Sequence, residues 1–241
     1  MASEDKQVKI HVTQRQLVVP GELLAEGEVE VGSPLIYKID NKYYSSVIGL
    51  VDVQENKLNL IPLEGYYFPK VGDLVIGLVI DIGITNWIVD IRAPYKAIMN
   101  ASDALNRQFN PIQDDLRRYF DIGDYVLAKI ALFDRLHNPV LTVKEKGLGK
   151  IVSGKIVEIA PSRVPRVIGK RKSMLNMLIE ETGCEIVVAQ NGRIWINCKD
   201  KQFEDILILA LKKIELEAHT TGLTDRVRNL IKEEKAKRGL S

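Results

Sequence analysis

The sequence predicts a mostly β protein with a C-terminal α/β domain, and three observations lead to this fold class. Up to about residue 148, apolar residues alternate in short runs separated by turn residues, a pattern typical of strands. After residue 149, apolar residues recur at helical spacing, most clearly over 203–216. The chain of 241 residues has room for two or three small domains, and we place them at 1–64, 65–148 and 149–241.

Residues 1–64 are expected to form a small N-terminal β domain after a short polar start. Leu35, Tyr37 and Ile39 alternate as on one face of a strand, and 43–53 is expected to be the return strand. A polar turn then leads into a last strand, and no segment here has helical periodicity.

Residues 65–148 are expected to form a five-stranded barrel of the OB type. The expected strands cover 74–81, 86–91, 97–99, 125–130 and 140–143. A long polar insertion after the third strand is expected to be a loop with a short helical piece. A β-barrel without any ligand is the alternative interpretation of the same pattern.

The C-terminal region is expected to fold in the order strand, helix, helix, strand, strand, helix, followed by a charged helix. The expected segments are 154–160, 161–167, 173–181, 184–188, 193–197, 203–216 and 224–237. Ser173 is the expected N-cap of the second helix, and Gly183 is its expected C-cap.

Basic residues are concentrated in one window, although the net charge of the chain is only +2. Residues 144–172 contain nine Lys or Arg and two acidic residues, so this window carries +7 and the rest of the chain −5. Such asymmetry favours a localised site for a polyanion. A solvated basic linker is the alternative interpretation.

The sharpest constellation is the segment Ile-Gly-Lys-Arg-Lys-Ser at 168–173, between two expected helices. A helix that begins directly after a glycine turn presents unpaired N–H groups, which favour phosphate. Gly169 permits close approach of the backbone, and Lys170, Arg171 and Lys172 add three cations at the same point.

The stretch 167–188, including Thr-Gly-Cys-Glu-Ile at 182–186, resembles the KH domain, whose Ile-Gly-x-x-Gly loop clamps about four nucleotides. The resemblance implies that this loop, with Arg163 and Arg166 before it, contacts single-stranded RNA. Lys172 replaces the second glycine, so a positive φ there would be strained. We therefore expect weaker base selectivity and a stronger salt dependence. A KH fold that only mediates protein contacts is the alternative.

The barrel is similar to the RNA-binding domain first seen in ribosomal protein S-one, on the basis of its Gly-Asp start at 72–73 and its Leu-Thr-Val-Lys end at 141–144. In that family an aromatic residue and a histidine stack bases, and the matching positions are Ile98 and Asn100.

The barrel is therefore expected to contact RNA mainly by charge. The candidate residues are Lys96, Lys129, Arg135 and Lys144. Trp87 and Tyr95 supply stacking only if exposed, and core packing is the expected role of Trp87.

The order of the three domains, with Val-Val-Pro-Gly-Glu-Leu-Leu at 18–24, resembles the KH-containing cap subunit of the archaeal exosome over nearly the whole chain. The resemblance implies three caps on a hexameric ring of RNase-PH-like subunits. The ring performs 3′-to-5′ phosphorolysis, and the cap binds RNA and guides it to the pore. It also implies that the N-terminal domain docks on the ring and that poly(A)-rich RNA is a favoured substrate.

Two other functions are compatible with these modules. A transcription or translation RNA-binding factor is the first, although elongation factors of this type usually carry two KH domains. An independent ribonuclease is the second. Its support is weak because His11, His137 and His219 are scattered, and the acidic pair 114–115 lies beside two arginines. We expect a non-catalytic protein without cofactor or metal.

The cysteine content and hydropathy indicate the compartment. Cys184 and Cys198 are too few for a disulfide framework, and we expect them to be reduced thiols. The sequence contains no apolar stretch expected to form a signal peptide or a membrane span, so a cytoplasmic protein is expected.

Overall fold

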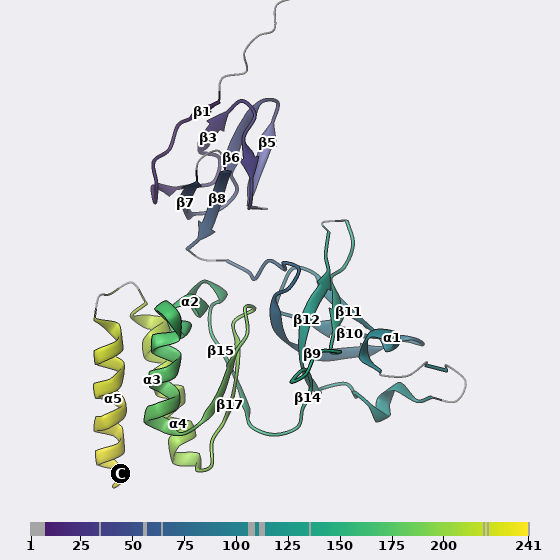
Figure 1. Cartoon of the computed structure of the whole chain (residues 1–241), viewed down its shortest axis with the longest axis vertical. Coiled ribbons are helices and arrows are strands. Elements are labelled where there is room, and N and C mark those ends of the chain that lie inside the picture. Colours follow the sequence, from purple (N-terminus) through teal and green to yellow (C-terminus); the bar gives the residue numbers. More distant parts are fainter. Residues whose placement is uncertain are drawn as a thin grey trace, which may run out of the picture. The chain divides into compact units, whose positions relative to one another are not determined.

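The computed structural model describes residues 8–33, 35–54, 57–63, 65–105, 109–110, 114–134, 136–218, 220 and 222–240. The chain divides into two compact units, one up to Gly65 and one from Tyr66 onward. Figure 1 labels their helices and strands.

The first unit consists of two small sheets in its described part, with strand orders β1-β3-β6-β5 and β2-β7-β8-β4. The strands are β1 (Lys9–Ile10), β2 (Leu17–Val18), β3 (Leu23–Glu26), β4 (Glu30–Val31), β5 (Ile36–Ile39), β6 (Lys42–Ser45), β7 (Gly49–Gln54) and β8 (Lys57–Pro62). Val18, Leu24, Val51 and Leu58 are fully buried between the sheets. The expected β domain is confirmed.

The single return strand expected over 43–53 is wrong. β6 and β7 belong to different sheets, and the chain bends between them. The Ser45 hydroxyl donates to the carbonyl of Val47 (2.6 Å) and the Ser46 hydroxyl to that of Leu35 (2.6 Å). Serine hydroxyls compete in this way with ladder hydrogen bonds, so the strand breaks here.

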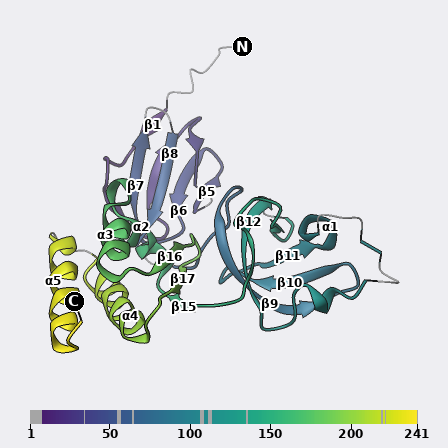
Figure 2. The ribbon, with the colours of Figure 1, turned by 60° about the horizontal axis from the view of Figure 1, so that its bottom comes forward.

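The second unit begins with the barrel, shown from another side in Figure 2. Its elements are β9 (Leu74–Ile82), β10 (Asn86–Asp90), β11 (Lys96–Asn100), α1 (Ala101–Ala104), η1 (Leu116–Arg118), β12 (Tyr125–Leu132), β13 (Val140–Thr142) and β14 (Gly149–Ile151). The strand order is β13-β11-β10-β9-β12-β14, and β13 also pairs with β12, which closes five strands into the expected OB-type barrel. Trp87 and Met99 are fully buried inside it.

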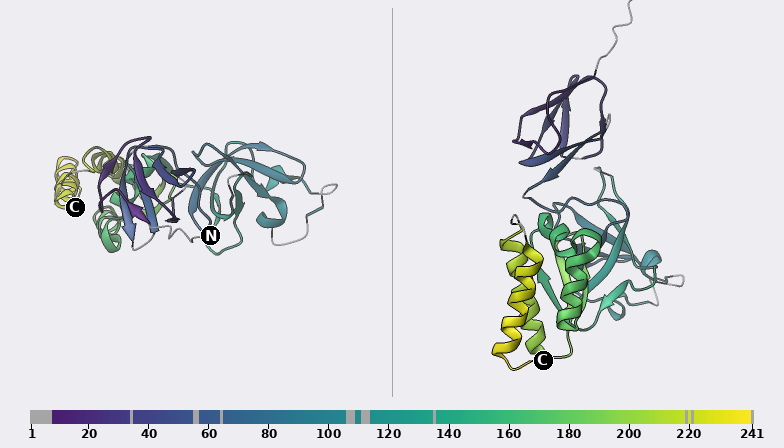
Figure 3. Two further views of the ribbon diagram at one scale, coloured as in Figure 1. Left: turned by 90° about the horizontal axis from the view of Figure 1, so that it is seen from above. Right: turned by 60° about the vertical axis from the view of Figure 1, so that its left-hand side comes forward.

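The KH fold follows in the expected order. Its elements are β15 (Lys155–Glu158), η2 (Pro161–Arg163), α2 (Val164–Ile168), η3 (Lys170–Lys172), α3 (Ser173–Thr182), β16 (Glu185–Val188), β17 (Arg193–Asn197), α4 (Lys201–Leu216) and α5 (Leu223–Lys237). The sheet order is β15-β17-β16, and the helices cover one of its faces (Figure 3). Leu178, Ile194, Ile206 and Val227 are fully buried in the shared core.

The barrel and the KH fold are joined through the turn between β16 and β17. The Asn191 amide nitrogen donates to the carbonyl of Ile76 (2.8 Å). Arg193, only 4% exposed, donates to the Asp90 carbonyl (2.8 Å), the Asp90 carboxylate (2.6 Å) and the Glu158 carboxylate (2.9 Å). Buried charge is stable only when paired in this way, so these bonds fix the two domains against each other.

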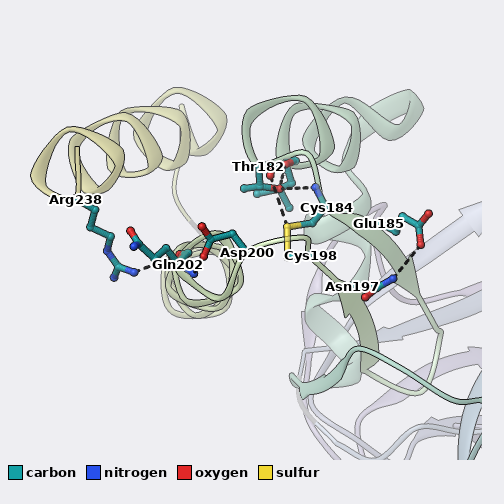
Figure 4. Close-up of a disulfide and its surroundings, with 9 residues drawn as sticks. Thr182, Cys184, Glu185, Asn197, Cys198, Asp200, Gln202 and Arg238 are labelled. Atoms are coloured by element: carbon teal, nitrogen blue, oxygen red, sulfur yellow. Dashed lines mark hydrogen bonds between the residues drawn. A yellow bond between two sulfur atoms is a disulfide. The ribbon is translucent and has the colours of Figure 1, made fainter. Parts of the chain in front are cut away.

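The expectation of reduced cysteines is wrong in this structure. Cys184 and Cys198 form a disulfide, shown in Figure 4, with their Cα atoms 4.4 Å apart. The reason lies in the register of β16 and β17, in which Glu185 lies opposite Asn197. Cys184 directly precedes Glu185 and Cys198 directly follows Asn197, so this register brings the two cysteines together. Sequence spacing does not reveal this register.

Candidate nucleic-acid interface

The loop between α2 and α3 has a positive φ at three of its four residues, and the two that are not glycine, Arg171 and Lys172, are left-handed. φ is 72° at Gly169, 52° at Arg171 and 63° at Lys172. For a non-glycine residue this conformation costs about 1–2 kcal/mol. The strain expected at Lys172 is therefore present. It also extends to Arg171, which the sequence pattern does not indicate.

The loop ends at an uncapped helix terminus. Lys172 occupies the N-cap position of α3 and its side chain makes no capping hydrogen bond, whereas the expected N-cap, Ser173, is the first helical residue. The expected C-cap at Gly183 is confirmed, with φ 65°. The first N–H groups of α3 are thus directed at the loop, where an anion is favoured.

Gly169 is required by the close packing of the loop against this terminus. A Cβ atom at Gly169 would lie 2.7 Å from the backbone nitrogen of Met174 and 2.9 Å from its Cβ. Both distances are shorter than real Cβ contacts, and one of them involves backbone. Only glycine therefore allows α2 to end so close to the start of α3.

All three cations of the loop are exposed. Within the part of the chain that the structure describes, Lys170, Arg171 and Lys172 form no salt bridge. Arg166 is exposed in the last turn of α2, and Arg163 is half-buried at the end of η2. The structure thus places four exposed cations and one half-buried cation on consecutive elements around one helix start, which is suited to binding a phosphate chain.

The candidate lysines of the barrel are less available. The Lys129 ammonium pairs with the Glu145 carboxylate, and the Nζ of Lys144 lies 3.6 Å from the Oδ1 of Asp103. Lys96 is exposed at the start of β11, opposite Asp90. Arg135 lies outside the described residues.

The two candidate stacking aromatics of the barrel, Trp87 and Tyr95, both pack against other aromatic side chains. Trp87 is fully buried, as expected, and its indole N–H donates to the carbonyl of Phe120 (2.8 Å). Tyr95 is half-buried and packs edge-on against Phe133 (5.1 Å between ring centroids) and Phe68 (5.9 Å). This aromatic cluster joins residues distant in sequence, so periodicity alone does not indicate it.

The acidic and histidine residues make local contacts. Asp115 accepts a hydrogen bond from the backbone of Arg117 at the start of η1. The Asp134 carboxylate lies 2.8 Å from the His137 ring, and this hydrogen bond lowers the pKa of Asp134. Among the described residues, no three His, Cys, Asp or Glu side chains are grouped so that they could hold a metal ion, and no helix is long and apolar enough to cross a membrane. His219 lies outside the described residues.

An OB-type barrel followed by a KH fold, with an exposed cationic loop at a helix start, defines a class of RNA-binding proteins. The sequence matches the family descriptions "Exosome RNA binding protein RRP4 N-terminal domain" over 15–64, "RRP4, S1 domain" over 66–131 and "KH domain" over 154–202. The chain belongs to the Rrp4 family of exosome complex components.

The relatives match over nearly their whole length. Exosome complex component Rrp4 of Ignisphaera aggregans is 50% identical over 246 residues, covering 98% of this chain and 97% of that protein. Its counterpart in Saccharolobus solfataricus is 53% identical over 235 residues, covering 97% and 94%. A crystal structure described as a putative exosome complex RNA-binding protein is 49% identical with a TM-score of 0.69, covering 72% of this chain and 99% of that one.

Proposed function

We propose that this protein is a non-catalytic cap component of the exosome that binds single-stranded RNA and guides it into a phosphorolytic 3′-to-5′ exoribonuclease ring. The observation that carries the proposal is the group of three exposed cations, Lys170, Arg171 and Lys172, at the uncapped start of α3. Its side chains supply positive charge for phosphate, and we assign the cleavage chemistry to the ring.

We assign 1–64 to ring docking, 65–148 to the barrel and 149–241 to the KH domain. An exposed apolar row supports docking by the first of these. Leu17 lies opposite Leu50 and Leu50 opposite Ile61, and the outer residues Leu17 and Ile61 are 55% and 54% exposed. Apolar side chains gathered on a surface are typical of protein interfaces.

We propose that three caps sit on one hexameric ring, together with other cap subunits. Several binding sites on one particle would compensate for the limited RNA affinity of a single loop. Linked sites raise the effective concentration of the RNA strand at each neighbouring site. We further propose that poly(A)-rich RNA is favoured and that the particle is cytoplasmic.

Removing the loop charges tests RNA binding. The triple variant K170A/R171A/K172A should bind single-stranded RNA more weakly, and its log–log salt slope should flatten by up to about 2, at roughly 0.7 per phosphate contact. The matched control is K201A/K212A/K232A, which removes three exposed lysines from α4 and α5 and should bind normally. Equal affinity and slope in the two triple variants would exclude the loop as the RNA site.

Copurification tests the assembly. The protein should be recovered with a phosphorolytic ring, and the variant I61E should be recovered less, because it places charge in the exposed apolar row. Recovery with RNA polymerase or ribosomes in place of the ring would instead favour the transcription or translation factor.

A further inference from the structure

A cleft of about 430 Å³ lies on the face of the KH sheet away from its helices. Trp195, Val187, Glu185 and Asn197 line it from the sheet, and the connection from the barrel lines it from the other side, with Val152 among its residues. We call it the linker cleft. Its volume falls in the range of small-ligand sites, which are common at domain junctions.

Trp195 forms a fixed aromatic wall of the linker cleft. Its indole N–H donates to the carbonyl of Ser153 (2.6 Å). A Cβ on Gly154 would lie 2.6 Å from the indole nitrogen, so the connecting chain packs directly against the ring. Trp195 as a whole is half-buried. A ring held in this way is prepared for stacking with a flat aromatic ligand such as a nucleobase.

Asn197 and Glu185 form a polar edge beside this wall. Asn197 follows Trp195 by two residues on β17, so both side chains lie on the same face of the sheet, about 7 Å apart along the strand. The Asn197 amide nitrogen donates to the Glu185 carboxylate (3.4 Å, Figure 4). Only the nitrogen can donate to a carboxylate, so this contact sets the amide orientation. Among the residues that the structure describes, the second N–H and the amide oxygen of Asn197 have no partner, so they are available as an adjacent donor and acceptor.

We propose that the linker cleft binds one unpaired adenine base of the RNA, stacked on Trp195 with its edge on Asn197. Adenine presents an N6–H donor next to an N1 or N7 acceptor, the pattern that an asparagine amide binds with two hydrogen bonds. In this pairing a ring C–H faces Glu185. The same pairing would place the cytosine O2 or the guanine N7 against the carboxylate, so both bases are disfavoured. The inference rests on the proposed RNA-binding function and adds a second contact site to it.

The intrinsic fluorescence of the full chain provides the test. The chain has two tryptophans, and Trp87 is fully buried, so quenching by a stacked base reports on Trp195. Titration with AMP, CMP, GMP and UMP should give saturable quenching that is strongest with AMP, and W195F should abolish it. N197D should weaken AMP binding about tenfold, because the carboxylate lacks the N–H donor. E185Q should raise CMP binding relative to AMP, and N229D on α5 serves as the matched control.

Absence of quenching, equal quenching by all four nucleotides, or unchanged AMP binding in N197D would overturn the inference. The triple variant K170A/R171A/K172A separates the two sites. AMP quenching that persists while RNA binding by this variant falls supports both proposals. RNA binding that falls in a chain without any AMP quenching leaves the loop function standing and rejects the cleft.

Discussion

Replacing Lys172 by glycine or by alanine removes the same positive charge from the KH loop, but only glycine also relieves the strain of its backbone. The wild-type residue holds φ at 63°, so glycine relieves strain of about 1–2 kcal/mol. Glycine also gains about 0.5–1 kcal/mol of conformational freedom in the unfolded chain. We expect K172G to be more stable than K172A by roughly 0.5–1 kcal/mol, because alanine keeps the strain and loses the same charge.

RNA affinity distinguishes the contribution of the loop charge from that of the loop backbone. Both variants lose one cation, so each should reduce the salt slope by about 0.7. K172G restores the loop pattern with two glycines and permits closer approach of the backbone to the strand. It should therefore bind RNA more tightly than K172A at equal salt.

Urea unfolding measures the difference in stability between the two variants. RNA titration at several salt concentrations measures their RNA affinity and its salt slope. Salt slopes in both variants that equal the wild-type slope would show that Lys172 contacts no phosphate. A K172G variant less stable than K172A would refute the assignment of a strained left-handed backbone at this position.

Three further predictions concern the framework around the loop. R193A leaves the Asp90 and Glu158 carboxylates without their shared partner, so it should lower the unfolding free energy by about 2–3 kcal/mol, whereas K155A at the surface should change it little. C184S/C198S removes a cross-link between residues separated by 14 positions and should cost about 3 kcal/mol, with reduction of the wild type lowering its melting temperature to that of the variant. Hydrogen bonds from Lys213 and, to a smaller extent, Arg226 lower the pKa of Glu217. The contribution of Glu217 to stability is therefore present above its unfolded pKa and is lost as the pH falls through its folded pKa. E217Q should accordingly lose less stability under acid than the wild type.

The local patterns of the sequence predict much of this fold. The helix α3 is predicted from Met174, Met177 and Leu178 at helical spacing, and its end from Gly183, because caps and periodicity are properties of neighbouring residues. The start of the helix is displaced by one residue because Lys172 adopts a left-handed conformation, which is unusual for lysine.

The features that the sequence does not predict are contacts between residues that are distant along the chain. The Cys184–Cys198 disulfide depends on the register of two strands, and the Arg193 contacts depend on the packing of two domains. The salt bridges that occupy Lys129 and Lys144 are likewise set by the closed barrel. Composition and periodicity locate such residues but do not identify their partners. The KH loop is predictable from the sequence because its glycine and cations are consecutive.

Photochemical cross-linking of single-stranded RNA to the assembled particle, read residue by residue by mass spectrometry, tests the RNA site most directly. Cross-links should concentrate at the segment from Gly169 to Lys172 and should weaken there as salt rises. A strand that cross-links elsewhere on this chain while that segment stays unlabelled at low salt would contradict the account.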